Sequence, residues 1–145
     1  MAIKQKTPRD AHQQLKCAPG ATYVDVRTEA EFAAGHPEGA INVPVMFIKS
    51  GQRQMNDEFV EIVDKLFERN APLIVGCLSG GRSQHACELL EEAGFGDLTN
   101  VVGGFGGARD QAGNVVAAGW KDEGLPVVVC IEECSYVTVR KKAGV

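Results

Sequence analysis

The sequence predicts an α/β fold with a mostly parallel sheet, and two observations carry this prediction. Short apolar runs alternate with amphipathic segments along most of the 145 residues, a pattern typical of βα units. One such run, Leu73–Gly76, leads into a cysteine and a glycine-rich turn, after which a helical pattern begins. Because open α/β sheets bind ligands where a strand turns into a helix, we expect Cys77 to lie in such a crevice.

The composition favours one globular domain and argues against several classes of function. The chain is long enough to bury a core, and its 44% hydrophobic and 23% charged residues are ordinary values. A net charge of −4 argues against a nucleic-acid partner, which normally meets a basic face. No apolar stretch reaches the length of a membrane span, and the polar N-terminus lacks a signal-peptide core. We therefore expect a cytoplasmic protein with no membrane partner.

The cysteines predict one special thiol among ordinary ones, without a disulfide framework or a metal site. They are odd in number and irregular in spacing, and the three histidines are scattered. They are Cys17, Cys77, Cys87, Cys130 and Cys134. The one competing hypothesis concerns Cys134, whose thiol on a mobile tail could accept sulfur and form a disulfide with Cys77.

In the first half of the chain, capping signals mark three helices between four strands. Thr7 followed by a proline is a typical helix start, and Thr28 with Glu31 forms a capping box. Asn56 caps a third helix with one apolar face. The expected order is an edge strand at Ile3–Gln5, a helix at Pro8–Lys16, a strand at Ala21–Arg27, a helix at Thr28–Ala34, a strand at Ile41–Val43, an irregular connection at Met46–Gln54, a helix at Asp57–Arg69 and the strand Leu73–Gly76.

The second half continues this alternation and then becomes less regular. An apolar stripe predicts a helix over Arg82–Ala93, and Gly94 supplies a left-handed stop. The expected order continues with a strand at Leu98–Val102, a tight turn at Gly103–Gly107, a short helix before Trp120 interrupted at Gly113–Asn114, strands at Val127–Val129 and Tyr136–Val139, and a frayed basic tail at Arg140–Lys142.

The loop after Leu73–Gly76 has the chemistry of an activated sulfur nucleophile. Its two glycines, Gly80 and Gly81, let backbone N–H groups turn inward and form a concave cradle for an anion. The N-terminus of the following helix adds partial positive charge, and Arg82 adds a full one. All three features favour thiolate over thiol at Cys77.

Several separated motifs, taken in order, resemble the single-domain rhodanese family of thiosulfate sulfurtransferase-like proteins. They are Asp25-Val26-Arg27, Glu31-Phe32, Gly35-His36, Gly39-Ala40-Ile41-Asn42-Val43-Pro44, Cys77-x-x-Gly80-x-Arg82-Ser83, Gly103-Gly104 and Trp120. The resemblance covers about residues 1–127. It departs from the family at Pro37, where an aliphatic residue is more frequent, and it leaves 128–145 as a C-terminal extension of unknown role.

The resemblance implies a three-layer α/β/α fold with a five-stranded, mostly parallel sheet and helices on both faces. It also implies that Cys77 carries sulfane sulfur as a persulfide, with no metal and no organic cofactor. Arg82 then helps to bind an anionic donor such as thiosulfate, and the backbone N–H groups of Leu78, Ser79, Gly80, Gly81 and Arg82 hold the persulfide. The acceptor is a thiol, cyanide or a protein.

Two alternatives from other functional classes stay open. A non-catalytic sulfur carrier or interaction module would have the same loop. A phosphatase of the related fold is disfavoured, because Cys77 and Arg82 are separated by four residues, whereas the phosphatase loop has five. The glycine turn lacks the third glycine of a dinucleotide fingerprint, since Arg109 stands there.

Other polar residues receive mostly structural predictions. Asp25 and Arg27 are expected to pair at a strand end, and His36 is expected to pack in its loop. His85 is a weaker candidate for the pocket. We expect Cys87 to be inert and half-buried, and Trp120 to lie in the core. Lys49 and Arg53 could line the mouth of the pocket, but the sequence does not place them.

Overall fold

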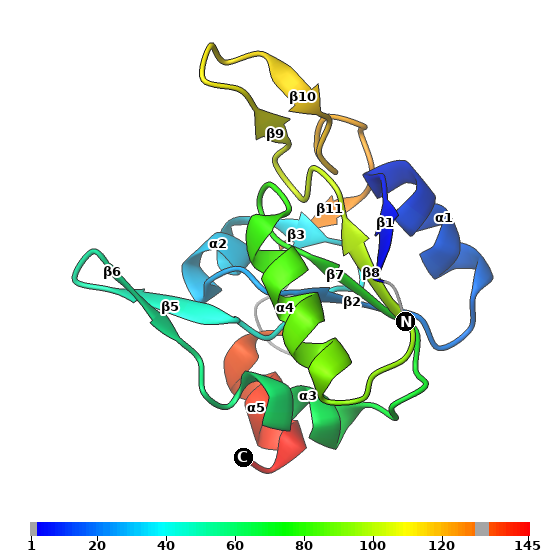
Figure 1. The fold of residues 1–145 in the computed structure, drawn as a ribbon, viewed down its shortest axis with the longest axis vertical. Coiled ribbons are helices and arrows are strands. Elements are labelled where there is room, and N and C mark those ends of the chain that lie inside the picture. Colours follow the sequence, from blue (N-terminus) through cyan, green and yellow to red (C-terminus); the bar gives the residue numbers. More distant parts are fainter. Residues whose placement is uncertain (1–2, 130–133) are drawn as a thin grey trace.

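A five-stranded parallel sheet forms the centre of the computed structural model, which describes residues 3–129 and 134–145 (Figure 1). Its strand order is β1-β8-β7-β2-β4, and every neighbouring pair is parallel. The strands are β1 (Lys4–Lys6), β2 (Thr22–Asp25), β4 (Ile41–Asn42), β7 (Leu73–Gly76) and β8 (Leu98–Val101). The predicted α/β fold with a five-stranded parallel sheet is confirmed.

Helices cover both faces of this sheet, which confirms the predicted three layers (Figure 1). They are α1 (Pro8–Cys17), α2 (Glu29–Ala34), α3 (Phe59–Leu66), α4 (Gly81–Glu92) and α5 (Tyr136–Ala143). Side chains alternate along each strand, so Val24 and Val75 join a core under α3, α4 and α5, whereas Tyr23 and Ile74 join a second core under α1. Within the described ranges, no helix is both long and apolar enough to cross a membrane.

The predicted helix starts are largely confirmed. The Thr7 side chain accepts a hydrogen bond from Asp10 N, and Thr28 and Glu31 form the reciprocal capping box. Helix α3 is shorter than the Asp57–Arg69 helix that we predicted. The Asn56 side chain accepts from Glu58 N in a turn that precedes the helix, so Asn56 does not cap its first residue.

Two connections that we predicted as irregular or helical are β-hairpins. The predicted irregular connection contains β5 (Met46–Lys49) and β6 (Gln52–Met55), paired antiparallel. Ser50 and Gly51 both have positive φ, 51° and 75°, which suits a two-residue hairpin turn. The predicted short helix before Trp120 is wrong as well, because β9 (Ala108–Arg109) pairs with β10 (Val115–Ala117).

The C-terminal segment packs on the sheet as a helix, so the predicted strand at Tyr136–Val139 is wrong. Tyr136, Val139 and Ala143 are spaced as one helical face and are buried in the larger core. This burial outweighs the preference of β-branched residues for strands. The predicted frayed tail is also wrong, because Arg140 lies in the helix and pairs with Glu58.

The predicted strand at Val127–Val129 is confirmed in part. Residues Val127–Val128 form β11, which pairs antiparallel with β3 (His36–Pro37).

Cys134 is disulfide-bonded, which contradicts the prediction that the cysteines form no disulfide framework, whereas Cys17, Cys77 and Cys87 are free. A bond between Cys77 and Cys134 is therefore absent, and Cys130 lies outside the described residues. The domain boundary at residue 127 stays a prediction.

Candidate active site

The candidate site lies where the strand order reverses. Strand β2 connects in one direction to its neighbour β4, and the chain then crosses back to add β7 on the other side. Cys77 follows the last residue of β7 directly. This carboxyl-end position at a switch point is where open α/β sheets bind ligands.

Cys77 is enclosed by its own loop, and the residue is 1% exposed. Gly80 N donates a hydrogen bond to Sγ over 3.1 Å, and Ser83 Oγ lies 3.4 Å from Sγ. Gly80 reaches this position with φ +117°, a conformation that favours glycine. We predicted that five loop N–H groups hold the sulfur. Among the described residues, the Gly80 N–H is the one that donates a hydrogen bond to Cys77 Sγ.

Ser83 and Asn100 form a polar contact beneath the sulfur that sequence reasoning missed. Both residues are buried, and Ser83 Oγ lies 2.5 Å from Asn100 Oδ1. Asn100 Nδ2 in turn donates to Gln5 Oε1 over 2.9 Å. A hydroxyl so close to Cys77 can donate to a thiolate or accept from a thiol. The available signal was Ser83 itself, which stands in the cysteine motif.

The glycine turn after β8 supports the cysteine loop from behind. Phe105 N donates to Cys77 O over 2.7 Å, and Gly106 N donates to Leu78 O over 2.8 Å. A Cβ on Gly104 would lie 2.4 Å from Cys77 O, and Gly104 has φ +56°. Only glycine therefore permits this approach, which gives the turn a role that its motif did not reveal.

Arg82 forms a two-pronged ion pair with Glu31, a residue for which the sequence had suggested only capping. Arg82 Nη1 lies 2.8 Å from Glu31 Oε1, and Nη2 lies 2.9 Å from Oε2. The hydrogen bond from Arg82 lowers the pKa of Glu31 to about 2, although partial burial opposes this shift. The same hydrogen bond raises the pKa of Arg82. The pair is therefore charged at every physiological pH and contributes no net charge.

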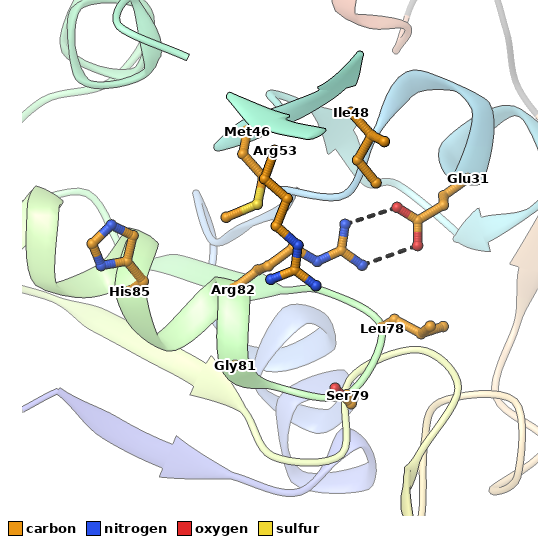
Figure 2. Close-up of a pocket in the computed structure, with 9 residues that line it drawn as sticks. All are labelled: Glu31, Met46, Ile48, Arg53, Leu78, Ser79, Gly81, Arg82 and His85. Carbon is orange, nitrogen blue, oxygen red and sulfur yellow. Dashed lines mark hydrogen bonds and ion pairs between the residues drawn. The ribbon is translucent and has the colours of Figure 1, made fainter. Parts of the chain in front are cut away.

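A cavity of about 460 Å³ lies between the loop and the β5–β6 hairpin (Figure 2). Four of the predicted site residues line it, namely Leu78, Ser79, Gly81 and Arg82. Cys77 and Gly80 do not line it, and Cys77 is buried. The other lining residues are Glu31, Met46, Ile48, Arg53 and His85. In the described part of the chain, no group of three or more His, Cys, Asp or Glu residues is placed to hold a metal ion.

Residues predicted to be structural lie mostly where we expected them. Arg27 Nη2 is 2.7 Å from Asp25 Oδ2, and both side chains are buried. His36 is buried and stacks on a neighbouring ring at a centroid distance of 3.6 Å. Trp120 is fully buried. Cys87 is fully buried rather than half-buried, and burial raises the pKa of its thiol to about 12.

Comparison with known proteins agrees with this geometry. The profile of the rhodanese-like domain matches residues 7–110. The chain belongs to the rhodanese-like family. It is 40% identical over 107 residues to thiosulfate sulfurtransferase 16, chloroplastic, of Arabidopsis thaliana, covering 74% of this chain and 79% of that protein. It is 30% identical to thiosulfate sulfurtransferase GlpE of Haemophilus influenzae, covering 74% of this chain and 89% of that protein.

Some relatives of this rhodanese-like chain are considerably longer. It covers 51% of the mitochondrial protein HIGH ARSENIC CONTENT 1 of Arabidopsis thaliana, with 40% identity over 86 residues. Among solved structures, the crystal structure of Rv0390 from M. tuberculosis superposes with a TM-score of 0.75 at 34% identity, covering 90% of this chain and all of that one. The expected rhodanese fold is thus confirmed.

Glu31→Gln is expected to lower the free energy of unfolding by about 1 kcal/mol near neutral pH. Glutamine keeps an oxygen for the Thr28 cap, so the change removes the carboxylate charge and one acceptor for Arg82 but preserves the cap. Because the pKa of Glu31 falls from 4.5 to about 2 on pairing, the carboxylate stabilises the fold fully above pH 4.5. This contribution is lost as the pH falls from there through about 2.

Urea unfolding of both proteins across this pH range measures the difference. The two stabilities should converge near pH 2, where Glu31 is becoming protonated. A difference that stays constant down to that pH would contradict the ionic origin of the contact.

Proposed function

We propose that this rhodanese-like protein is a sulfurtransferase that moves sulfane sulfur through a persulfide on Cys77. The observation that carries this proposal is the position of the Cys77 sulfur at the strand–helix turn, where Gly80 N donates a hydrogen bond to it over 3.1 Å. That donor and the N-terminus of α4 favour negative charge on sulfur, both before and after a persulfide forms. The naming of several relatives as thiosulfate sulfurtransferases supports the same reaction.

The proposed reaction is a double displacement. The Cys77 thiolate attacks the outer sulfur of thiosulfate, the S–S bond of thiosulfate breaks, and sulfite leaves with the bonding electron pair. The new bond joins Cys77 Sγ to the transferred sulfur. A thiolate or cyanide then attacks this outer sulfur, and Cys77 leaves as a thiolate. Neither step requires a general base once Cys77 is ionised.

Mass spectrometry tests the proposal directly. After incubation with thiosulfate, the intact protein should gain one sulfur atom, on a peptide that contains Cys77, and one equivalent of sulfite should appear. Subsequent addition of cyanide should remove the sulfur as thiocyanate. Turnover of a phosphate ester without any sulfur gain would overturn the proposal in favour of the phosphatase alternative. Sulfur gain without multiple turnover would indicate the carrier alternative.

Arg82→Ala is expected to raise KM for thiosulfate about tenfold, with a smaller effect on an uncharged persulfide donor. Two causes contribute, because the variant removes a cation and leaves the Glu31 carboxylate unpaired at the cavity. Steady-state kinetics with both donors measures the contrast. The double variant Arg82→Ala/Glu31→Gln should recover part of the affinity for thiosulfate. Equal losses with both donors would count against a role of Arg82 in anion binding.

A further inference from the structure

We propose that Arg53, on the β5–β6 hairpin, is a specificity-determining residue that binds the negatively charged group of an organic thiol acceptor. This inference rests on the proposed sulfurtransferase function and names a substrate class for it. Arg53 is 24 positions before Cys77 in the chain, yet it lines the same cavity as Leu78 and Ser79 (Figure 2).

The charges around the cavity leave Arg53 as the source of its positive charge. Glu31 and Arg82 cancel each other through their two hydrogen bonds. His85 lies 4.0 Å from the carboxylate of Glu88. No hydrogen bond or ion pair joins the Arg53 side chain to any other described residue, and Figure 2 shows this side chain extending from the hairpin toward the loop. A substrate anion in this cavity would therefore meet Arg53 without competition from a carboxylate partner.

The hairpin register places an apolar surface beside this guanidinium. Ile48 pairs with Arg53 directly across the two strands, so the two side chains lie on the same face. Met46 is two residues before Ile48 and shares that face. Both apolar side chains line the cavity, and Leu78 adds a third from the loop. Ile48 is 56% exposed and Leu78 is 43% exposed.

A cation beside an apolar wall fits an organic anion better than a small inorganic one. A carboxylate can pair with the Arg53 fork, while the carbon chain of the same molecule covers Met46, Ile48 and Leu78. The cavity volume of about 460 Å³ leaves room for such a molecule. We therefore assign the acceptor class as organic thiols that carry a carboxylate.

In the step concerned, the acceptor thiolate attacks the outer sulfur of the Cys77 persulfide. The S–S bond to Cys77 Sγ breaks, a new S–S bond joins the acceptor to the transferred sulfur, and Cys77 leaves as a thiolate. The persulfide is formed as an anion, and its negative charge stays on the transferred sulfur, so the charges balance. No oxidant or reductant beyond the persulfide and the thiol is required.

The test uses protein loaded with sulfur from thiosulfate and then mixed with one of three small thiols that differ in charge. These are 3-mercaptopropionate, 2-mercaptoethanol and cysteamine, which carry negative, zero and positive charge on the group remote from sulfur. Loss of the persulfide is followed by mass spectrometry in single-turnover mixtures. Each thiol is compared with itself across protein variants, so differences in thiolate fraction cancel.

Arg53→Gln is expected to slow transfer to 3-mercaptopropionate about three- to fivefold, to leave 2-mercaptoethanol unchanged, and to accelerate cysteamine. Lys49→Gln is the matched control. It removes the same charge from the same hairpin, but Lys49 lies on the opposite face, beside Phe47. This control should leave all three rates unchanged.

Equal rate changes for all three thiols in Arg53→Gln, or the same charge dependence in Lys49→Gln, would overturn the inference and leave the proposed function intact. Failure of the parent protein to form a persulfide would overturn both.

Discussion

Cys77→Ser is expected to abolish sulfur transfer and leave the fold intact. Serine is nearly isosteric with cysteine, and its hydroxyl can still accept the Gly80 N–H. However, a hydroxyl is un-ionised at neutral pH and cannot form a persulfide. Thiocyanate formation from thiosulfate and cyanide should fall by more than about 10³-fold. Steady-state assay and intact mass together measure the loss, and circular dichroism checks the fold.

The other free cysteines provide matched controls for this variant. Cys17 is exposed, at the end of α1, and its replacement by serine tests whether this accessible thiol is needed for sulfur gain. Cys87 is a buried residue of α4, and burial raises the pKa of its thiol to about 12, which makes it a poor nucleophile at neutral pH. Cys17→Ser and Cys87→Ser should both gain one sulfur from thiosulfate. Parent-level transfer in Cys77→Ser would refute the proposed mechanism.

Asp25→Asn is expected to lower the free energy of unfolding by about 3–5 kcal/mol, because it leaves the buried Arg27 guanidinium without its counter-charge. The Asp25 carboxylate accepts from Arg27 Nε and Nη2, and Arg27 Nη2 also donates to Gly35 O. The Arg27 guanidinium lies 4.3 Å from the centroid of the Phe105 ring, so the pair is enclosed on several sides. Urea unfolding at neutral pH measures the loss.

Two comparisons separate the buried charge from simple loss of a contact. Arg9→Ala breaks the pair with Glu123 on the surface, where the Arg9 side chain is 66% exposed, and should cost less than about 1 kcal/mol. The double variant Asp25→Asn/Arg27→Met removes both charges and should be less destabilised than the sum of its single variants. Additive losses would show that the two side chains act independently.

Local sequence signals predicted the elements whose structure depends on near neighbours. The capping box at Thr28 joins residues three positions apart, and the apolar stripe of α4 repeats within two turns. Cys77 and Gly80 likewise lie within one short loop, so the nature of the candidate nucleophile could be predicted before its surroundings were known. These features are confirmed as structure, whereas the roles assigned to the site residues stay predictions.

Long-range packing decided the elements that the sequence misrepresented. The β-branched residues of Tyr136–Ala143 favour a strand, but burial of Tyr136 and Val139 against the core stabilises a helix there. The β5–β6 hairpin depends on positive φ at Ser50, which is uncommon for a residue with a side chain. A pattern of hydrophobicity shows neither the core contacts of Tyr136 and Val139 nor the positive φ of Ser50.

The sequence by itself determined the fold class, the family resemblance and the cysteine at the strand–helix turn, because each is written in local patterns of hydrophobicity, capping residues and motif spacing. Tertiary structure alone decided how the site is charged. The Arg82–Glu31 pair joins residues 51 positions apart, and Arg53 reaches the cavity through a hairpin. Only the folded structure brings these distant charges to one cavity, where the Arg82–Glu31 pair cancels and the Arg53 guanidinium is left without a carboxylate partner among the described residues.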